Sequence, residues 1–279
     1  MKQERFFPRE IIRDQDAEVK HFTREGQRDR FGNRLFTSRD LAYPDGSGER
    51  VKAGLLISSE GENFIKRQRG ILKDISWGLS QIETPGKGTP ERFIDLGGGR
   101  TLEAITTGGQ SNFYILSVNG EKYAIKTHAP PRKGHEEIHQ PYVNEMLQSQ
   151  TVALDLARDL AALKIRMPDF LFASGQVSCS RYEADTGRQE VHMADLLDKL
   201  NNLEALMLPY IVKREDSGDP LWRNADVDIP TRLEDRMATV VQNFRIRSNG
   251  TLVWIDPFVY YRPDRASEGE TAQEEDLSF

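Results

Sequence analysis

Residues 108–128 read GGQSNFYILSVNGEKYAIKTH, two runs of apolar and aromatic residues on either side of an Asn-Gly pair. A pair such as Asn119-Gly120 between apolar runs is the strongest short-range signal for a β-hairpin, because both residues accept the positive φ of a two-residue turn. The preceding TLEAITTG, residues 101–108, has the composition of a strand as well. The stretch therefore predicts three consecutive strands.

The segments that follow suggest a regular order of helices and strands. Apolar residues at intervals of three and four predict a long helix over residues 142–164. The remaining predicted elements are a strand over 167–177, a polar turn over 180–190, a short helix over 193–204, a buried strand ALMLPYIV over 205–212, a helix over 228–242 and a hairpin over 244–258.

The chain before this region is richer in charge. Residues 1 to about 52 predict an irregular, partly disordered arm with isolated aromatic anchors at Phe31 and Phe36. A helix-like section follows over residues 53–83, where apolar residues recur at helical spacing.

The run ETPGKGTPER, residues 83–92, holds two prolines and two glycines and marks a domain boundary. We therefore expect a charged N-terminal extension over 1–90, a main domain over 91–265 and an acidic, disordered tail over 266–279.

Composition limits the class of protein. The 279 residues carry a formal net charge of -6, which argues against a nucleic-acid-binding protein with a generally basic surface. A single cysteine, Cys179, excludes a disulfide framework and a cysteine-based zinc site within one chain. The N-terminus lacks the apolar region of a secretory signal, and no run of apolar residues is long enough for a membrane span. We expect a cytoplasmic protein without a membrane partner.

A glycine turn lies between the first two predicted strands. Gly108 and Gly109 allow the backbone to approach a ligand closely, and successive amides in such a turn can hold phosphate oxygens. Ser111 and Asn112 follow directly and add polar side chains to the same place.

A lysine ends the third predicted strand, in Tyr123-Ala124-Ile125-Lys126. An ammonium group beside an apolar strand needs a partner, because an unpaired buried charge is very costly. Glu145, near the start of the long helix, is the candidate partner. A strand lysine that a helix glutamate holds and that contacts nucleotide phosphates is the arrangement found in kinases.

The stretch GGQSNFYILSVNGEKYAIK resembles the N-terminal lobe of the protein-kinase-like superfamily, and is most similar to its aminoglycoside phosphotransferase and choline kinase branch. The resemblance implies that ATP and Mg²⁺ bind the protein. It also implies that the strand over 205–212 leads into an adenine-binding hinge, with Pro209 and Tyr210 in the nucleotide site. The final hairpin resembles the metal-binding segment of the family, which makes Asn243 and Asp256 the magnesium ligands.

The chain departs from the family at the catalytic base. The family has His-x-Asp with its aspartate five residues before the metal-binding asparagine, where this chain has Ala238. Asp235 is the nearest candidate for a displaced base. The 23 residues after Asp256 are too few for the large helical lobe of a typical kinase.

Two functions follow from this comparison. The first is an atypical kinase that transfers phosphate to an unidentified acceptor. The second is an inactive, pseudokinase-like scaffold that contacts a protein partner through the N-terminal arm or the truncated lobe. Both share one architecture: an α+β fold with an antiparallel five-stranded sheet, one long covering helix, a truncated second lobe and a charged N-terminal extension.

A zinc hydrolase is the remaining alternative. His135-Glu136-x-x-His139 has the spacing that places two imidazoles and a general base on one helical face. Gly134 before this motif and Pro141 after it disfavour the helix that the motif requires. The flanking residues therefore predict a connecting loop between the Lys126 strand and the Glu145 helix.

Overall fold

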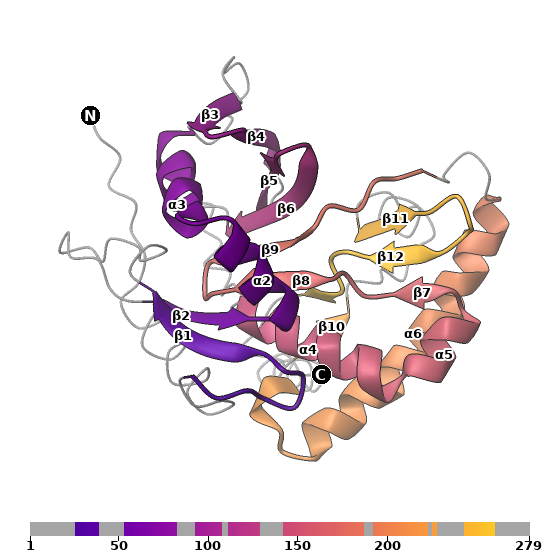
Figure 1. Ribbon diagram of the computed structural model, residues 1–279. Helices are drawn as coiled ribbons and strands as arrows, with labels where there is room; N and C mark the ends of the chain where they lie inside the picture. Colours follow the sequence, from indigo (N-terminus) through magenta and orange to yellow (C-terminus); the bar gives the residue numbers. More distant parts are fainter. Residues whose placement is uncertain are drawn as a thin grey trace, which may run out of the picture.

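The computed structural model shows an α+β fold built on one large antiparallel sheet (Figure 1). The structure describes residues 26–38, 53–82, 93–107, 111–128, 142–186, 192–222, 225–227 and 243–259.

The large sheet has eight strands in the order β1-β2-β8-β9-β6-β5-β4-β3, with every neighbouring pair antiparallel. The strands are β1 (Arg34–Ser38), β2 (Ala53–Ile57), β3 (Phe93–Gly97), β4 (Arg100–Thr107), β5 (Ser111–Val118), β6 (Glu121–His128), β8 (Phe170–Ala173) and β9 (Val177–Arg181). The three strands predicted around residues 101–128 are confirmed as β4, β5 and β6.

The predicted turn at the β5–β6 hairpin is confirmed. Asn119 and Gly120 have φ angles of 52° and 87°, and Val118 pairs with Glu121 across them. Positive φ at both central positions gives a turn whose twist matches the twist of the flanking strands. This turn fixes the register that places Lys126 opposite Phe113.

Two short helices cover one face of the sheet, α2 (Ser59–Arg67) and α3 (Ile71–Gln81) (Figure 1). The helix expected over 53–83 is therefore two helices, preceded by β2 and separated at Gly70, whose φ is 79°. The apolar cluster on this face includes Phe64, Ile75, Leu102, Leu116, Ile125 and Cys179.

Close packing on this face depends on Gly61 in α2. A Cβ at this position would lie 1.9 Å from the carbonyl oxygen of Leu171 in β8. Glycine is therefore required where α2 meets the backbone of the sheet.

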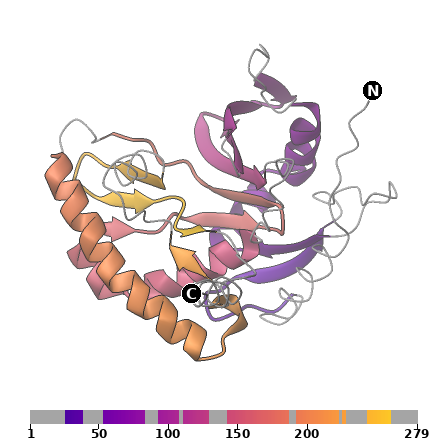
Figure 2. The same cartoon turned by 180° about the vertical axis from the view of Figure 1, so that it is seen from behind.

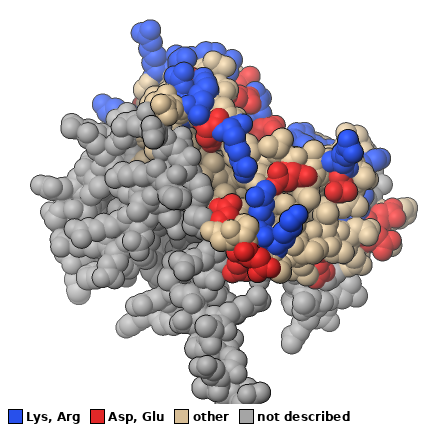
Figure 3. Space-filling model, turned by 90° about the horizontal axis from the view of Figure 1, so that it is seen from below, with Lys and Arg blue, Asp and Glu red and all other residues tan. Residues whose placement is uncertain are grey.

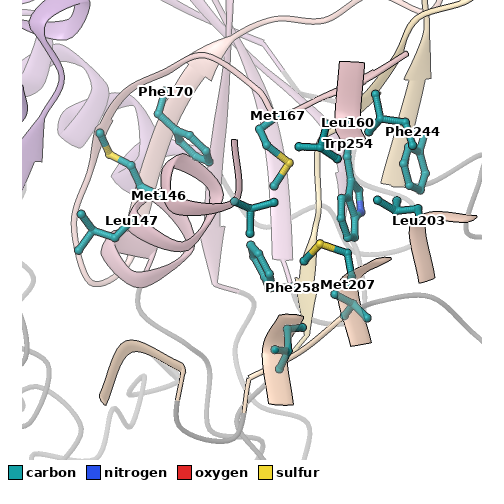
Figure 4. Packing of buried hydrophobic residues seen from close by; sticks show 14 of the residues in the cluster. Met146, Leu147, Leu160, Met167, Phe170, Leu203, Met207, Phe244, Trp254 and Phe258 are labelled. Atoms are coloured by element: carbon teal, nitrogen blue, oxygen red, sulfur yellow. The ribbon is translucent and has the colours of Figure 1, made fainter. Parts of the chain in front are cut away.

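The opposite face of the sheet packs against α4 (Tyr142–Asp155), and further elements lie beyond this helix (Figure 2). These elements are α5 (Ala157–Ala162), α6 (Met193–Asp216), a 3-10 helix η2 (Pro220–Trp222), a small sheet of β11 (Phe244–Ile246), β12 (Leu252–Trp254) and β7 (Ile165–Arg166), and the pair β10 (Asp226–Val227) and β13 (Phe258–Val259). Figure 4 shows side chains from α4, α6 and the β11–β12 hairpin in one apolar cluster, with Trp254 fully buried.

Several predictions beyond residue 142 need revision. The helix expected over 142–164 is divided into α4 and α5 at Leu156, and the strand expected over 167–177 is the β8–β9 hairpin. The hairpin expected over 244–258 is confirmed as β11 and β12. The helix expected over 228–242 and the acidic tail lie outside the described residues.

The prediction of a buried strand at 205–212 is wrong. These residues continue α6, which runs for 24 residues and contains Pro209. Buried residues at helical spacing extend along the whole helix: Leu196, Leu200, Leu203, Met207 and Ile211. The physical reason is that a short apolar segment does not by itself distinguish a buried strand from a buried helix.

The prediction of an irregular arm before residue 52 is wrong for Arg34–Ser38. This segment forms β1, which pairs with β2. With β2 and β3, which are also not among the predicted strands, it belongs to a large sheet of eight strands instead of five. Leu35 of β1 and Leu55 of β2 are buried, which favours the pairing of these two strands with the sheet. Phe31 and Phe36 are partly buried against the two apolar clusters.

The surface seen from below in Figure 3 has acidic and basic side chains interspersed. Among the helices in the described part of the chain, none combines the length and the apolar composition that a bilayer span requires.

Candidate functional site

Strand β6 directs neighbouring side chains to the two opposite faces of the large sheet. Successive residues of a strand alternate between faces, so Ile125 and Lys126 point in opposite directions. Ile125 is fully buried in the cluster beneath α2 and α3. Lys126 therefore lies on the side of α4 and the small sheet.

The Lys126 ammonium group joins three separate elements of the chain. Its Nζ donates a hydrogen bond of 2.6 Å to the carbonyl oxygen of Ile255. It also lies 3.4 Å from Glu145 Oε1 and 3.3 Å from Asp256 Oδ1. Strand β6, helix α4 and the segment after β12 thus converge on one cation. The structure brings together three of the site residues predicted from sequence, and we call them the Lys126 cluster: Lys126, Glu145 and Asp256.

The charges in the Lys126 cluster do not balance, since two carboxyl groups face one ammonium. Burial alone would lower the pKa of Lys126, but the attraction of Asp256 and then of Glu145 outweighs it and raises the pKa. Burial raises the pKa of Glu145 to about 7, Lys126 opposes this shift, and Asp256 adds to it. The site therefore has excess negative potential that a proton or a further cation would neutralise.

Access to the Lys126 cluster is through Asp256. The Asp256 side chain is 40% exposed, whereas those of Lys126 and Glu145 are 13% and 10% exposed. A ligand from solvent would meet the aspartate first and the lysine behind it.

Asn243 and Asp256, the predicted magnesium ligands, flank the β11–β12 hairpin. The Ile255 N–H donates to the Asn243 carbonyl at 2.8 Å, so the backbone of Asn243 lies beside the residue before Asp256. Asn243 is buried, with 5% of its surface exposed. Mg²⁺ binds carboxylate and amide oxygens and commonly takes one or two carboxylates together with nucleotide phosphates, so these residue types fit it.

Ser111 and Asn112 begin β5 and lie on opposite faces of the sheet. Their pairing with His128 and Thr127 is regular, so alternation places Ser111 on the Lys126 face and Asn112 on the other. A hydrogen bond of 3.2 Å links the Tyr142 hydroxyl at the start of α4 to the Ser111 hydroxyl. The structure therefore associates Ser111 with the Lys126 face but does not bring Asn112 there. Gly108 and Gly109 lie outside the described residues.

Pro209 and Tyr210 do not lie on the strand from which their hinge role was inferred. Both belong to α6. The Tyr210 hydroxyl donates to Asp155 Oδ2 at 2.6 Å, and its ring meets Trp222 edge-on at 5.4 Å between centroids. These contacts join α6 to the end of α4 and to η2, which is a packing arrangement.

Two other predicted groups fall outside the described residues: the displaced base Asp235, and the zinc motif with His135, Glu136 and His139. Within the ranges that the structure covers, no group of three or more His, Cys, Asp or Glu side chains is placed to hold a metal ion.

The sequence did not reveal two further contributors to this site. The Ile255 carbonyl makes the shortest contact to Lys126, and a backbone atom leaves no signature in a sequence. The sequence predicts Tyr142 only as the first residue of a helix, because its hydrogen bond to Ser111 joins segments 31 residues apart.

Comparison with known proteins identifies no family for this chain. No family model matches the sequence, and no curated protein matches it significantly.

Proposed function

We propose that the protein is an atypical kinase-like protein that binds ATP and Mg²⁺ at the Lys126 cluster. The observation that carries the proposal is the convergence of Lys126, Glu145 and Asp256. A strand lysine, a helix glutamate and an aspartate after a hairpin are the groups that kinases use to hold nucleotide phosphates and magnesium.

Each residue of the cluster has a defined role in this proposal. Lys126 contacts the α and β phosphates, and Glu145 holds its ammonium group in place. Asp256, together with Asn243, holds Mg²⁺, which neutralises charge on the phosphates. With both carboxyl groups ionised, the cluster has two negative charges and one positive charge, which supports a cation at this position. Ser111 adds a hydroxyl on the same face.

The contacts of Lys126 also support a second candidate, a scaffold that does not transfer phosphate. An ammonium group has three N–H donors, and Lys126 has three acceptors within hydrogen-bonding distance: Glu145, Ile255 and Asp256. A phosphate group must therefore displace at least one of these contacts. A protein in which Lys126 keeps all three contacts would not hold nucleotide phosphates for transfer. Such a protein would act as a binding module.

Titration calorimetry with a non-hydrolysable ATP analogue and Mg²⁺ tests nucleotide binding. We expect saturable binding to the wild-type protein and loss of binding in Lys126→Met. Lys122→Met is the matched control, because Lys122 is an exposed lysine of the same strand. At a ligand concentration of 100 times Kd, bound nucleotide should add about 2.7 kcal/mol to the free energy of unfolding. Absence of binding to folded wild-type protein would contradict the proposal.

Transfer of labelled phosphate from ATP separates the enzyme from the scaffold. An active enzyme should label itself or an added protein extract, and Asp256→Asn should abolish this labelling. Nucleotide binding without any phosphate transfer would favour the scaffold.

A further inference from the structure

Helices α2 and α3 cover the face of the large sheet opposite to the Lys126 cluster, and the junction between them is strongly basic. The end of α2, the turn at Gly70 and the start of α3 read KRQRGILK, residues 66–73. The cations of this run are all exposed: Lys66, Arg67, Arg69 and Lys73. The run itself contains no carboxylate.

Two of the three carboxylates on these helices are neutralised by arginines of the sheet. Glu60 pairs with Arg181 of β9, and Asp74 pairs with Arg100 of β4. Since both arginines come from outside α2 and α3, these two ion pairs leave the charge of residues 66–73 uncompensated.

The third carboxylate, Glu62, is outnumbered by cations. Its oxygens lie 3.1 Å from Arg28 Nη2, 3.3 Å from Arg34 Nε and 3.7 Å from Lys66 Nζ. Three cations therefore share one buried carboxylate, and Lys66 is the most distant and the most exposed of them. In the part of the chain that the structure describes, the other cations of residues 66–73 form no ion pair with a carboxylate.

This local excess of positive charge lies on a chain whose formal net charge is -6. At physiological ionic strength the Debye length is about 8 Å, so acidic groups elsewhere on the surface are largely screened from a ligand at this junction. The nearby cations therefore determine which charge binds here, and they favour an anion.

Trp77 adds an exposed aromatic ring beside these charges. It follows Lys73 by four residues, so the two side chains lie on the same face of α3. Its side chain is 51% exposed, and it is the one large hydrophobic residue exposed on α2 and α3, which the structure describes in full. We call these five residues the α2–α3 surface: Lys66, Arg67, Arg69, Lys73 and Trp77.

We propose that the α2–α3 surface binds single-stranded nucleic acid without sequence preference. The cations would contact successive phosphates, and an unpaired base would stack on the Trp77 ring. A duplex supplies phosphates but keeps the faces of its bases covered by their neighbours. A bilayer surface would require several exposed apolar side chains, whereas this surface has a single ring.

Fluorescence anisotropy tests the proposal on the full chain without ATP. The probes are labelled oligo-dT and oligo-U of about 15 nucleotides, long enough to span such a surface. A duplex of the same length and dextran sulfate supply negative charge without an unpaired base. We expect both single strands to bind more tightly than either of these. A surface that recognises charge alone would prefer the duplex, which has the higher charge density. Equal or tighter binding of the duplex or of dextran sulfate would therefore overturn the proposal, as would the absence of oligonucleotide binding.

Intrinsic fluorescence reports contact with Trp77. The chain has three tryptophans, and Trp222 and Trp254 are fully buried, so an added base can stack only on Trp77. We expect single strands to quench the emission, and Trp77→Ala to remove this quenching and weaken binding about five- to hundredfold. A blue shift on addition of phosphatidylserine vesicles, with no quenching by oligonucleotides, would assign the surface to a membrane and overturn the proposal.

Variants of the cations locate the phosphates. Arg69→Ala and Lys73→Ala should each reduce the slope of log affinity against log salt concentration by about 0.7, the loss of one phosphate contact to a single strand. Lys213→Ala is the matched control, because Lys213 is an exposed lysine of α6, beyond the opposite face of the sheet. An unchanged slope in both folded variants would contradict the assignment.

Lys126→Met separates this proposal from the proposed nucleotide site. The variant should bind oligonucleotides as the wild type does, since Lys126 lies on the opposite face of the sheet from α2 and α3. Loss of oligonucleotide binding in folded Lys126→Met would place the strand at the Lys126 cluster and overturn the α2–α3 assignment. Failure of the nucleotide proposal and failure of this one are therefore distinguishable.

Discussion

The two faces of the large sheet have opposite characters, and strand β6 contributes to both. On the α2 and α3 face, Ile125 lies in an apolar cluster with Leu102, Leu116 and Cys179, all fully buried. On the α4 face, one residue further on, Lys126 lies among carboxylates and a backbone carbonyl. The strand alternation that builds a core on one side therefore presents a cation on the other.

This difference separates the residues that stabilise the fold from those that are suited to bind a ligand. Burial of Ile125 is favourable without any partner, since it removes apolar surface from water. Burial of Lys126 is favourable only with charged partners, and its two carboxyl groups leave excess negative charge once both are ionised. Substitutions on the first face should change stability most, and substitutions on the second should change ligand binding and pH dependence.

The largest expected effect on stability is at Ile125. Ile125→Ala removes a fully buried side chain and leaves a cavity, so we expect the free energy of unfolding to fall by about 2–5 kcal/mol. Urea denaturation measures this change. Nucleotide affinity of the folded variant should stay close to that of the wild type. A loss below about 1 kcal/mol would contradict the packed core described for this face.

An intermediate effect is expected from pH at Glu145. The folded protein keeps this carboxyl protonated up to about pH 7, whereas an unfolded chain loses the proton near its ordinary value of 4.5. The folded state therefore binds more protons in this window, and the free energy of unfolding falls as pH rises through it. The contribution is on the order of 1–3 kcal/mol.

Urea denaturation of the wild type and Glu145→Gln at several pH values isolates this contribution. The amide side chain of the variant does not titrate, so the difference in unfolding free energy between the two proteins should change between about pH 4.5 and about pH 7. Lys126 and Asp256, the charged groups that face Glu145, are present in both proteins. If the unfolding free energies of the two proteins changed in parallel with pH, the raised pKa of Glu145 would be refuted.

The smallest expected effect is at Tyr210, on α6. Tyr210→Phe keeps the ring against Trp222 but removes the hydrogen bond donated to Asp155 and the one accepted from Arg214, which should cost about 0.5–1.5 kcal/mol for each bond. Because Tyr210 lies on a helix and not on a hinge strand, nucleotide affinity should not change. Thermal denaturation and calorimetry measure the two quantities. A marked loss of nucleotide affinity would restore the hinge prediction.

Local patterns were sufficient to predict the centre of the sheet. Strands β4, β5 and β6 follow from apolar runs and from Asn119-Gly120, a turn whose geometry is fixed by two neighbouring residues. The sequence predicts Lys126 and Glu145 as a pair because a charge beside an apolar strand needs a partner, and the structure places Lys126 Nζ 3.4 Å from Glu145 Oε1.

Long-range packing accounts for the predictions that failed. Strand β1 lies in a charged segment, and burial of Leu35 depends on contacts with distant elements. The run around Pro209 predicts a strand because it is apolar and short, whereas its helical period becomes visible only from Leu196 to Ile211. The Ile255 carbonyl accepts a hydrogen bond from Lys126, which lies 129 residues earlier in the sequence. No local pattern indicates such a contact.

Covalent labelling of Lys126 tests the central claim most directly. An ATP-derived acyl phosphate transfers its acyl group to a lysine that lies beside the bound phosphates, and peptide mass spectrometry identifies that lysine. We predict labelling of Lys126 in the wild-type protein that excess ATP with Mg²⁺ prevents, with any labelling of the exposed Lys66 and Lys122 unaffected by ATP. Labelling of surface lysines alone, with Lys126 unmodified, would contradict the assignment of the Lys126 cluster as a nucleotide site.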